Sequence, residues 1–334
     1  MADEAGGVIR PGVAEEVRAG RVAVLGGTGL IGRHVVSALL HANVRNAIAT
    51  HRARAPFAAN DVEWRQANLL NLEDARSAIV GADTVVHCAG RLSTASTLRQ
   101  DPVSSVLDTL RIGTNVLQAA SEARVARLVM ISSCTGYAEG TSEKQEGAMF
   151  ANDPPSDWFG VGWMHRYLEK QLQWYCTHLR TIRSAIVLRP TLVYGPHDDF
   201  RVETAHFVPS FVRRVVERER PIEVWGDGMQ TRNLLHAADA ASAIVAALGN
   251  DVGYNAYNVA SAGSTSVNDV LSVLLDIDGF GDADVVHRHD RSGNVAAVNV
   301  SGAAFSLRFS WLPRVSLREG LSETVAWYRE HRKR

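Results

Sequence analysis

Three glycines at fixed spacing constrain the fold of this chain more than any other feature. They lie in Gly26-Gly27-Thr28-Gly29-Leu30-Ile31-Gly32, after the apolar run 21–25 and before 30–42, where apolar residues recur with helical spacing. Glycines between a strand and a helix permit a tight turn and let the backbone approach a pyrophosphate at the helix N-terminus. A turn without a ligand is the alternative, but this setting favours a dinucleotide-binding turn.

The rest of the first half alternates apolar strands with amphipathic helices. This alternation predicts an α/β fold with a Rossmann-type, doubly wound parallel sheet. We expect an N-terminal extension over 1–20, a dinucleotide-binding domain over 21–190 to which some later segments return, and a smaller substrate-binding lobe over 191–334. The expected strands are 47–50, 61–65, 84–88, 128–132 and 184–188, and the expected helices are 72–80, 103–123, 162–179 and 317–332.

Composition excludes several classes of partner. A formal net charge of -1 over 334 residues gives no reason to expect nucleic acid or an anionic membrane. The three cysteines are far apart and lack metal-binding spacing, so neither a disulfide framework nor a metal site is expected. The first twenty residues contain no uninterrupted apolar run, which favours a cytoplasmic protein.

The end of the second strand indicates which dinucleotide is bound. The segment that starts at His51 carries Arg52 and Arg54 and has no Asp or Glu to accept from a ribose 2′-hydroxyl. Guanidinium groups here favour a 2′-phosphate, so we predict NADP(H). A solvated loop with two arginines is the alternative.

Several motifs together resemble the extended short-chain dehydrogenase/reductase family, in particular its nucleotide-sugar epimerases, dehydratases and ketoreductases. The similar segments are 68–69, 85–90, 132–137, 188–196, 224–233 and 291–295. The resemblance implies a catalytic serine at Ser133, which also contacts substrate. It implies further cofactor contacts at Asn68, Leu69, Cys88, Ala89, Gly90, Pro190 and Val193, and substrate contacts at Thr191, Val208, Trp225, Arg232 and Arg291, the last two on a diphosphate.

One motif of that family is missing from this chain. Aligning Glu169 with the family's helix glutamate places Val161 at the catalytic tyrosine and His165 at the catalytic lysine. Valine donates no proton, whereas histidine titrates near neutrality. His165 could therefore bind the nicotinamide ribose or act as the acid, or it could simply be a packed residue; a solvent-relayed proton is a further possibility. Tyr137 is more simply explained as a packing residue.

We therefore expect an NADPH-dependent reductase of a nucleotide-linked keto sugar, such as a dTDP-4-keto-6-deoxysugar of deoxysugar biosynthesis. Reduction depends least on the missing tyrosine and lysine, because epimerases and dehydratases must first deprotonate a sugar hydroxyl. A non-catalytic NADP(H)-binding sensor or scaffold is the alternative, and an NAD-dependent epimerase ranks third. Helices 103–123 and 162–179 resemble the family's dimer helices, which predicts a homodimer.

Overall fold

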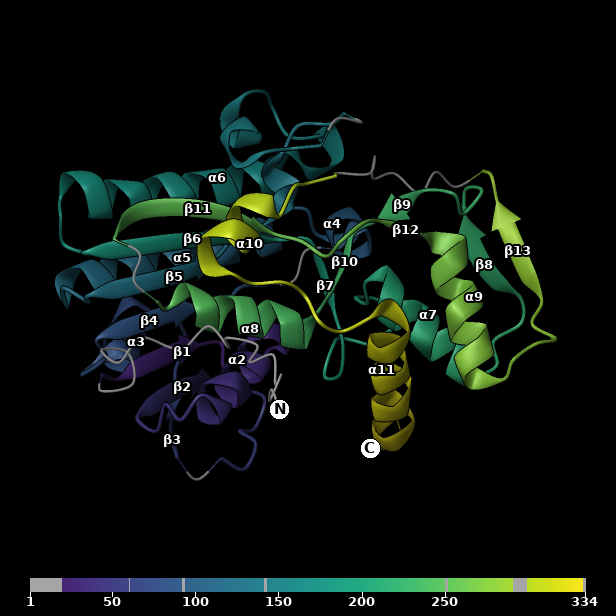
Figure 1. The fold of residues 1–334 in the computed structure, drawn as a ribbon, viewed down its shortest axis with the longest axis horizontal. Helices are drawn as coiled ribbons and strands as arrows, with labels where there is room; N and C mark the ends of the chain where they lie inside the picture. Colours follow the sequence, from purple (N-terminus) through teal and green to yellow (C-terminus); the bar gives the residue numbers. More distant parts are fainter. Residues whose placement is uncertain are drawn as a thin grey trace, which may run out of the picture.

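A seven-stranded parallel sheet forms the centre of the molecule (Figure 1). The computed structural model describes residues 20–59, 61–91, 94–140, 143–249, 252–290 and 299–332. The strand order is β11-β6-β5-β4-β1-β2-β3, and every neighbouring pair is parallel. This confirms the predicted Rossmann-type α/β fold. The strands are β1 (Val22–Leu25), β2 (Ala47–His51), β3 (Val62–Gln66), β4 (Thr84–His87), β5 (Arg127–Ile131), β6 (Ser184–Pro190) and β11 (Gly253–Val259).

Helices cover both faces of this sheet. In the view of Figure 1, α2 and α8 lie in front of the sheet and α5 lies behind it. One apolar core joins α2, α8 and α10 to the front face, and a second joins α3, α5 and α6 to the other face. The bounds are α2 (Leu30–His41), α3 (Leu72–Ile79), α5 (Ser104–Glu122), α6 (Phe159–Gln173), α8 (Ala237–Ala247) and α10 (Ala303–Phe309).

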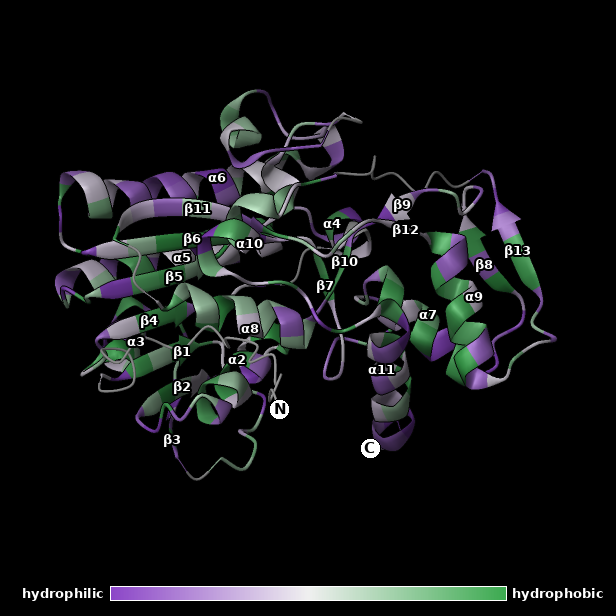
Figure 2. Cartoon of the chain, in the orientation of Figure 1, coloured by the Kyte–Doolittle hydropathy of each residue, from purple (hydrophilic) through white to green (hydrophobic). Residues whose placement is uncertain are grey.

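The strands are apolar because both of their faces are covered. All four residues of β1 are fully buried, and the side chains of successive residues enter opposite cores. Figure 2 shows hydrophobic residues along the strands of the sheet. This packing leaves the carboxyl ends of the strands as the place where loops gather polar side chains.

Residues beyond 190 contribute to both parts of the molecule. Strand β11 pairs with β6 along its whole length, and α8 packs against α2. The remaining elements form a smaller lobe with its own apolar core. These elements are α7 (Phe207–Val216), β8 (Ile222–Trp225), α9 (Val267–Asp278), β13 (Val285–Arg288) and α11 (Leu317–His331).

The structure departs from the predicted elements in detail. Helix α6 begins three residues earlier than predicted and ends at Gln173, where a π-helical turn (Trp174–His178) follows. The Leu179 N–H donates to the Trp174 carbonyl in this wider turn. Beyond residue 190, only the last helix was predicted with bounds. The short elements that were not predicted include α4 (Ala95–Gln100), β7 (Leu192–Tyr194), β9 (Thr231–Arg232), β10 (Leu234–His236) and β12 (Thr265–Ser266). Across the described ranges, no helix combines the length and the apolar character that crossing a membrane requires.

Candidate active site

The glycine turn joins β1 to α2 and requires glycine for steric reasons. Gly26 has a φ of +86°, and its N–H donates to the Thr50 hydroxyl at 2.9 Å. A methyl group on Gly32 would lie 2.1 Å from the Gly26 carbonyl oxygen, so a side chain there cannot be accommodated without moving the turn. Helix α2 has no side-chain cap and no acidic residue in its first turn. Its N–H groups near Leu30 and Ile31 are therefore available to an anionic ligand, and the turn fits a pyrophosphate.

Arginines gather beside this turn. Arg52 and Arg54 are exposed at the end of β2, and Arg54 donates to the Thr28 carbonyl at 3.2 Å. Arg33 lies over the Phe57 ring at 4.2 Å, and its pKa is lowered by burial and by the charge of Arg54. Neither Arg33 nor Arg54 forms an ion pair with another described residue. Arg33 was not among the residues predicted for the site, although it directly follows the last glycine of the motif.

The predicted contacts after β2 and β3 lie at the same edge. His51 is half-buried and packs edge-on against Trp64, with ring centroids 6.4 Å apart. Asn68 is exposed, and its backbone N–H donates to the Asp74 carboxylate at 2.8 Å. Leu69 is buried. The exposed Asn68 side chain is thus free to meet a ligand, whereas Leu69 packs in the core.

The segment after β4 packs directly against the glycine turn. A methyl group on Gly26 would lie 2.9 Å from the Ala89 backbone and 3.1 Å from the Cys88 carbonyl carbon. Gly90 lies against Thr109 of α5, because a methyl group on Gly90 would lie 3.3 Å from the Thr109 methyl carbon. The structure therefore brings the predicted residues after β4 into direct contact with the predicted turn.

Ser133 and helix α6 meet at the end of β5. Ser133 caps a short 3-10 helix, η1 (Cys134–Gly136), and α6 packs against that helix. A methyl group on Gly162 would lie 2.9 Å from the Thr135 carbonyl and 2.5 Å from Pro154, so only glycine allows this approach. Val161 directly precedes this glycine, and His165 follows Val161 by one helical turn of α6.

Neither residue at the tyrosine and lysine positions carries a charge at neutral pH. Val161 is buried and apolar. Burial lowers the pKa of half-buried His165 to about 4. Its imidazole is therefore neutral at pH 7, and cannot supply the positive charge that a lysine would place there.

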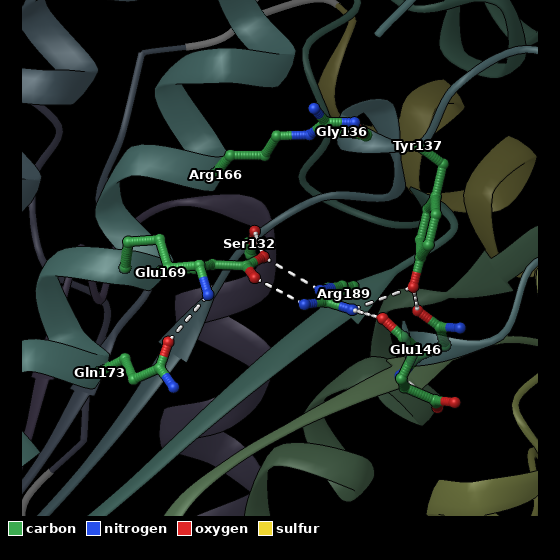
Figure 3. Close-up of polar contacts among 10 residues, drawn as sticks. Ser132, Gly136, Tyr137, Glu146, Arg166, Glu169, Gln173 and Arg189 are labelled. Atoms are coloured by element: carbon green, nitrogen blue, oxygen red, sulfur yellow. Dashed lines mark hydrogen bonds and ion pairs between the residues drawn. The ribbon is translucent and has the colours of Figure 1, made fainter. Parts of the chain in front are cut away.

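A buried ionic network holds α6 to the sheet below this site (Figure 3). The Glu169 carboxylate accepts from Arg189 Nη2 at 2.6 Å, from Arg189 Nε at 3.0 Å and from the Ser132 hydroxyl at 2.6 Å. Tyr137 is fully buried, donates to Asn258 at 2.7 Å and accepts from Arg189 at 3.0 Å. This confirms that Tyr137 is a packing residue. Glu169 faces inward, which supports the register that puts Val161 and His165 at the lost positions.

The substrate side contains a partly buried cation. Arg232 of β9 donates to the Thr231 carbonyl at 2.7 Å, burial lowers its pKa, and it forms no ion pair among the described residues. Such a group is suited to an anionic ligand. Trp225 is 37% exposed, and Arg99 of α4 lies 5.1 Å from its ring centroid. Arg291, the second predicted diphosphate contact, lies outside the described residues.

Other predicted residues have structural contacts of their own. The Thr191 hydroxyl donates to Asn233 at 2.8 Å, and the side chain is buried. Val208 is fully buried in the core of the small lobe, so its side chain packs there rather than lining an open surface. Pro190 and Val193 are half-buried at the end of β6 and in β7.

A cavity of about 950 Å³ lies beside β9. Segments 260–264 and 299–303 contribute to its lining, with Thr231 and Asn233. None of the predicted site residues that the structure describes lines it, although Thr231 and Asn233 flank Arg232 in the chain.

A family model matches most of this chain, over residues 22–260, under the description "NAD dependent epimerase/dehydratase family". The chain belongs to that family. This confirms the resemblance drawn from the motifs, and the family's description carries a nicotinamide dinucleotide as its cofactor. The glycine turn fits such a group, because a side chain at Gly26 or Gly32 would fill its cradle.

Named relatives extend over nearly the whole chain. The dTDP-4-dehydro-6-deoxy-D-allose reductase of a Streptomyces species is 30% identical to this chain, in an alignment that covers 94% of this chain and 98% of the reductase. "Putative GDP-L-fucose synthase 2" of Arabidopsis thaliana is 26% identical over 99% of this chain and 98% of its own. The structure of UDP-glucose 4-epimerase from Thermotoga maritima superimposes with a TM-score of 0.81 at 22% identity, covering 93% of this chain and 99% of that one. The last comparison shows the shared fold.

Proposed function

We propose that this protein uses NADPH to reduce the keto group of a nucleotide-linked sugar, and that its substrate is a dTDP-4-keto-6-deoxysugar of deoxysugar biosynthesis. This proposal rests on the functional groups that remain at the end of β5 and on α6. Ser133 can donate a hydrogen bond, but Val161 and neutral His165 provide neither a phenol nor a cation. Reduction of a carbonyl needs a donor to the developing oxyanion, whereas epimerisation and dehydration need a strong base first.

The arginines support the cofactor and substrate assignments. Arg52, Arg54 and Arg33 surround the end of β2, where a 2′-phosphate would bind in a Rossmann fold. Arg232 is positioned to bind the diphosphate of the sugar nucleotide, because it is partly desolvated and carries no described ion pair. The named dTDP-sugar reductases among the relatives agree with this substrate class.

In the proposed mechanism, the residues of this chain bind the two ligands and stabilise the developing oxyanion. A bound reduced nicotinamide would supply the hydride. The N-terminus of α2 and the glycine turn would hold the pyrophosphate of that dinucleotide, and Arg232 would anchor the substrate's diphosphate. Ser133 donates a hydrogen bond to the carbonyl oxygen as negative charge develops there.

The test is turnover with defined keto sugars. The protein is mixed with NADPH and dTDP-4-keto-6-deoxyglucose or related sugars, and loss of the reduced nicotinamide's absorbance is followed. We expect turnover with NADPH in preference to NADH, and a large loss of kcat in Ser133→Ala. Tight NADPH binding without turnover across several such sugars would count against the proposal.

Two other functions are separable by binding measurements. The loss of the tyrosine and lysine favours a non-catalytic NADP(H)-binding protein, but such a protein would not need Arg232. This alternative would be supported if the protein binds NADPH and dTDP gives the protein no protection. An NAD-dependent epimerase would show a preference for NAD⁺ and would interconvert UDP- or dTDP-sugars without net oxidation.

We also infer a homodimer that forms through α5 and α6. Phe159, Trp163 and Tyr167 follow one another at four-residue spacing and are 49%, 42% and 56% exposed, and Leu107 of α5 is 40% exposed. A run of large exposed apolar side chains on one helix face is typical of a protein interface. Sedimentation of the wild type should show a dimer, and Trp163→Glu should shift it toward monomer. A monomeric wild type at micromolar concentration would contradict this.

A further inference from the structure

The hydrogen bonds of Ser133 leave it only one role toward a ligand. Its Oγ accepts the Thr135 backbone N–H at 3.2 Å and the Thr135 hydroxyl at 2.9 Å. A serine hydroxyl has two lone pairs and one proton. Both lone pairs are therefore occupied, and no described residue accepts the remaining proton.

We propose that Thr135 is a positioning residue that fixes Ser133 as the hydrogen-bond donor to the substrate's carbonyl oxygen. The proposal rests on the reductase function proposed above. As hydride reaches the carbonyl carbon, the carbonyl π bond breaks and its oxygen takes the Ser133 proton. Ser133 Oγ then takes the Thr135 Oγ1 proton, and Thr135 takes one from water, which leaves as hydroxide. Ser133 Oγ and Thr135 Oγ1 each lose one O–H bond and gain another, the carbonyl oxygen gains one, and water loses one.

This chain of hydroxyls matters because other proton donors nearby are unsuited. Val161 has no polar atom, and neutral His165 has no acidic imidazolium proton to give at pH 7. Burial raises the pKa of the Cys134 thiol, which lies between the two hydroxyls in sequence, to about 11. Tyr137 is occupied by Asn258 and Arg189. A hydroxyl that accepts a hydrogen bond becomes a better donor, so Thr135 strengthens the Ser133 bond as well as aiming it.

The contact between Thr135 and α6 fixes the second hydroxyl in turn. The Thr135 carbonyl lies so close to α6 that Gly162 is needed there, and Pro154 closes the other side. The backbone of Thr135 is therefore held between η1 and α6. Its hydroxyl can reach Ser133 without rearranging the chain.

The test compares Thr135→Val, which removes the hydroxyl but keeps the shape, with Thr135→Ser, which keeps the hydroxyl. Thr177→Val is the matched control. Thr177 lies after the end of α6, and its exposed hydroxyl donates to the backbone carbonyl of Gln173, so this variant also removes a hydroxyl that donates a hydrogen bond. We expect kcat to fall by about tenfold to a hundredfold in Thr135→Val with KM little changed. Thr135→Ser should recover most of kcat, Thr177→Val should match the wild type, and NADPH affinity and thermal stability should not change.

Each outcome decides the inference. Equal kcat in Thr135→Val and the wild type overturns it, and so does a parallel loss in Thr135→Ser. If the wild type reduces no keto sugar, the proposed function fails and crystal structures of the wild type and Thr135→Val decide the positioning claim. A Ser133 rotamer that is held in the wild type and released in the variant supports it. An unchanged rotamer, or a wild-type Ser133 Oγ out of contact with Thr135, overturns it.

Discussion

Removing the charge of Glu169 should destabilise the protein more than any surface change. The Glu169 side chain is fully buried and that of Arg189 is 3% exposed. Arg189 donates two hydrogen bonds to this carboxylate, and Ser132 donates a third. Glu169→Gln keeps the shape of the side chain but leaves the Arg189 guanidinium buried without a counter-charge.

The expected cost follows from that geometry. Removing one partner of a buried ion pair costs about 3 to 5 kcal/mol, because the other charge cannot be rehydrated. For a chain of 334 residues, that corresponds to a fall in Tm of roughly 4 to 7 °C. The exposed pair of Arg318 and Asp276 is the matched control, with side chains 61% and 66% exposed. Asp276→Asn should cost less than about 1 kcal/mol.

Thermal unfolding followed by calorimetry measures both variants. The double variant Glu169→Gln, Arg189→Met should lose less than the sum of the two single variants, because neither charge is then left unpaired. Equal shifts in Glu169→Gln and Asp276→Asn would refute the reasoning, and so would strict additivity in the double variant.

Three further predictions concern the ligands and pH. Arg54→Ala should weaken NADPH binding by about tenfold to a hundredfold without affecting NADH binding, since one charge-assisted contact is lost. Arg45→Ala is the control, because Arg45 is exposed and precedes β2 at the other end of the strand; fluorescence titration measures the affinity of both variants. The kcat should be flat between about pH 5 and about pH 9, because His165 stays neutral above its pKa of about 4; a titration near pH 6.5 would contradict this. Arg232→Met should raise the Kd for dTDP by about tenfold or more in a calorimetric titration, with NADPH affinity unchanged as the internal control.

The turn between β1 and α2 could be predicted from the sequence because local patterns determine its shape. A strand, three glycines and a helix fix the turn through backbone sterics, and the structure shows the clash that requires Gly32. The parallel strand order then brings the ends of β2, β3, β4 and β5 to one edge. Residues placed there from motifs, such as Ala89 and Ser133, follow from that topology.

Other parts of the site depend on contacts that no local pattern shows. The role proposed for Arg33 rests on its position over Phe57, 24 residues later in the chain. The role of Thr135 comes from the direction of one hydroxyl toward Ser133. The neutrality of His165 comes from burial, which sequence spacing does not report. Val208 shows the converse, because a position at which the family resemblance implied a substrate contact has its side chain inside the small-lobe core.

The central claim is that hydride passes from the nicotinamide to a sugar carbonyl without a tyrosine. The most direct measurement uses NADPH fully deuterated at C4 of the nicotinamide, with dTDP-4-keto-6-deoxyglucose, and analyses the product by NMR. We predict that deuterium appears on the former carbonyl carbon, in step with the NADP⁺ formed. Unchanged NADPH together with a sugar free of deuterium would contradict the claim.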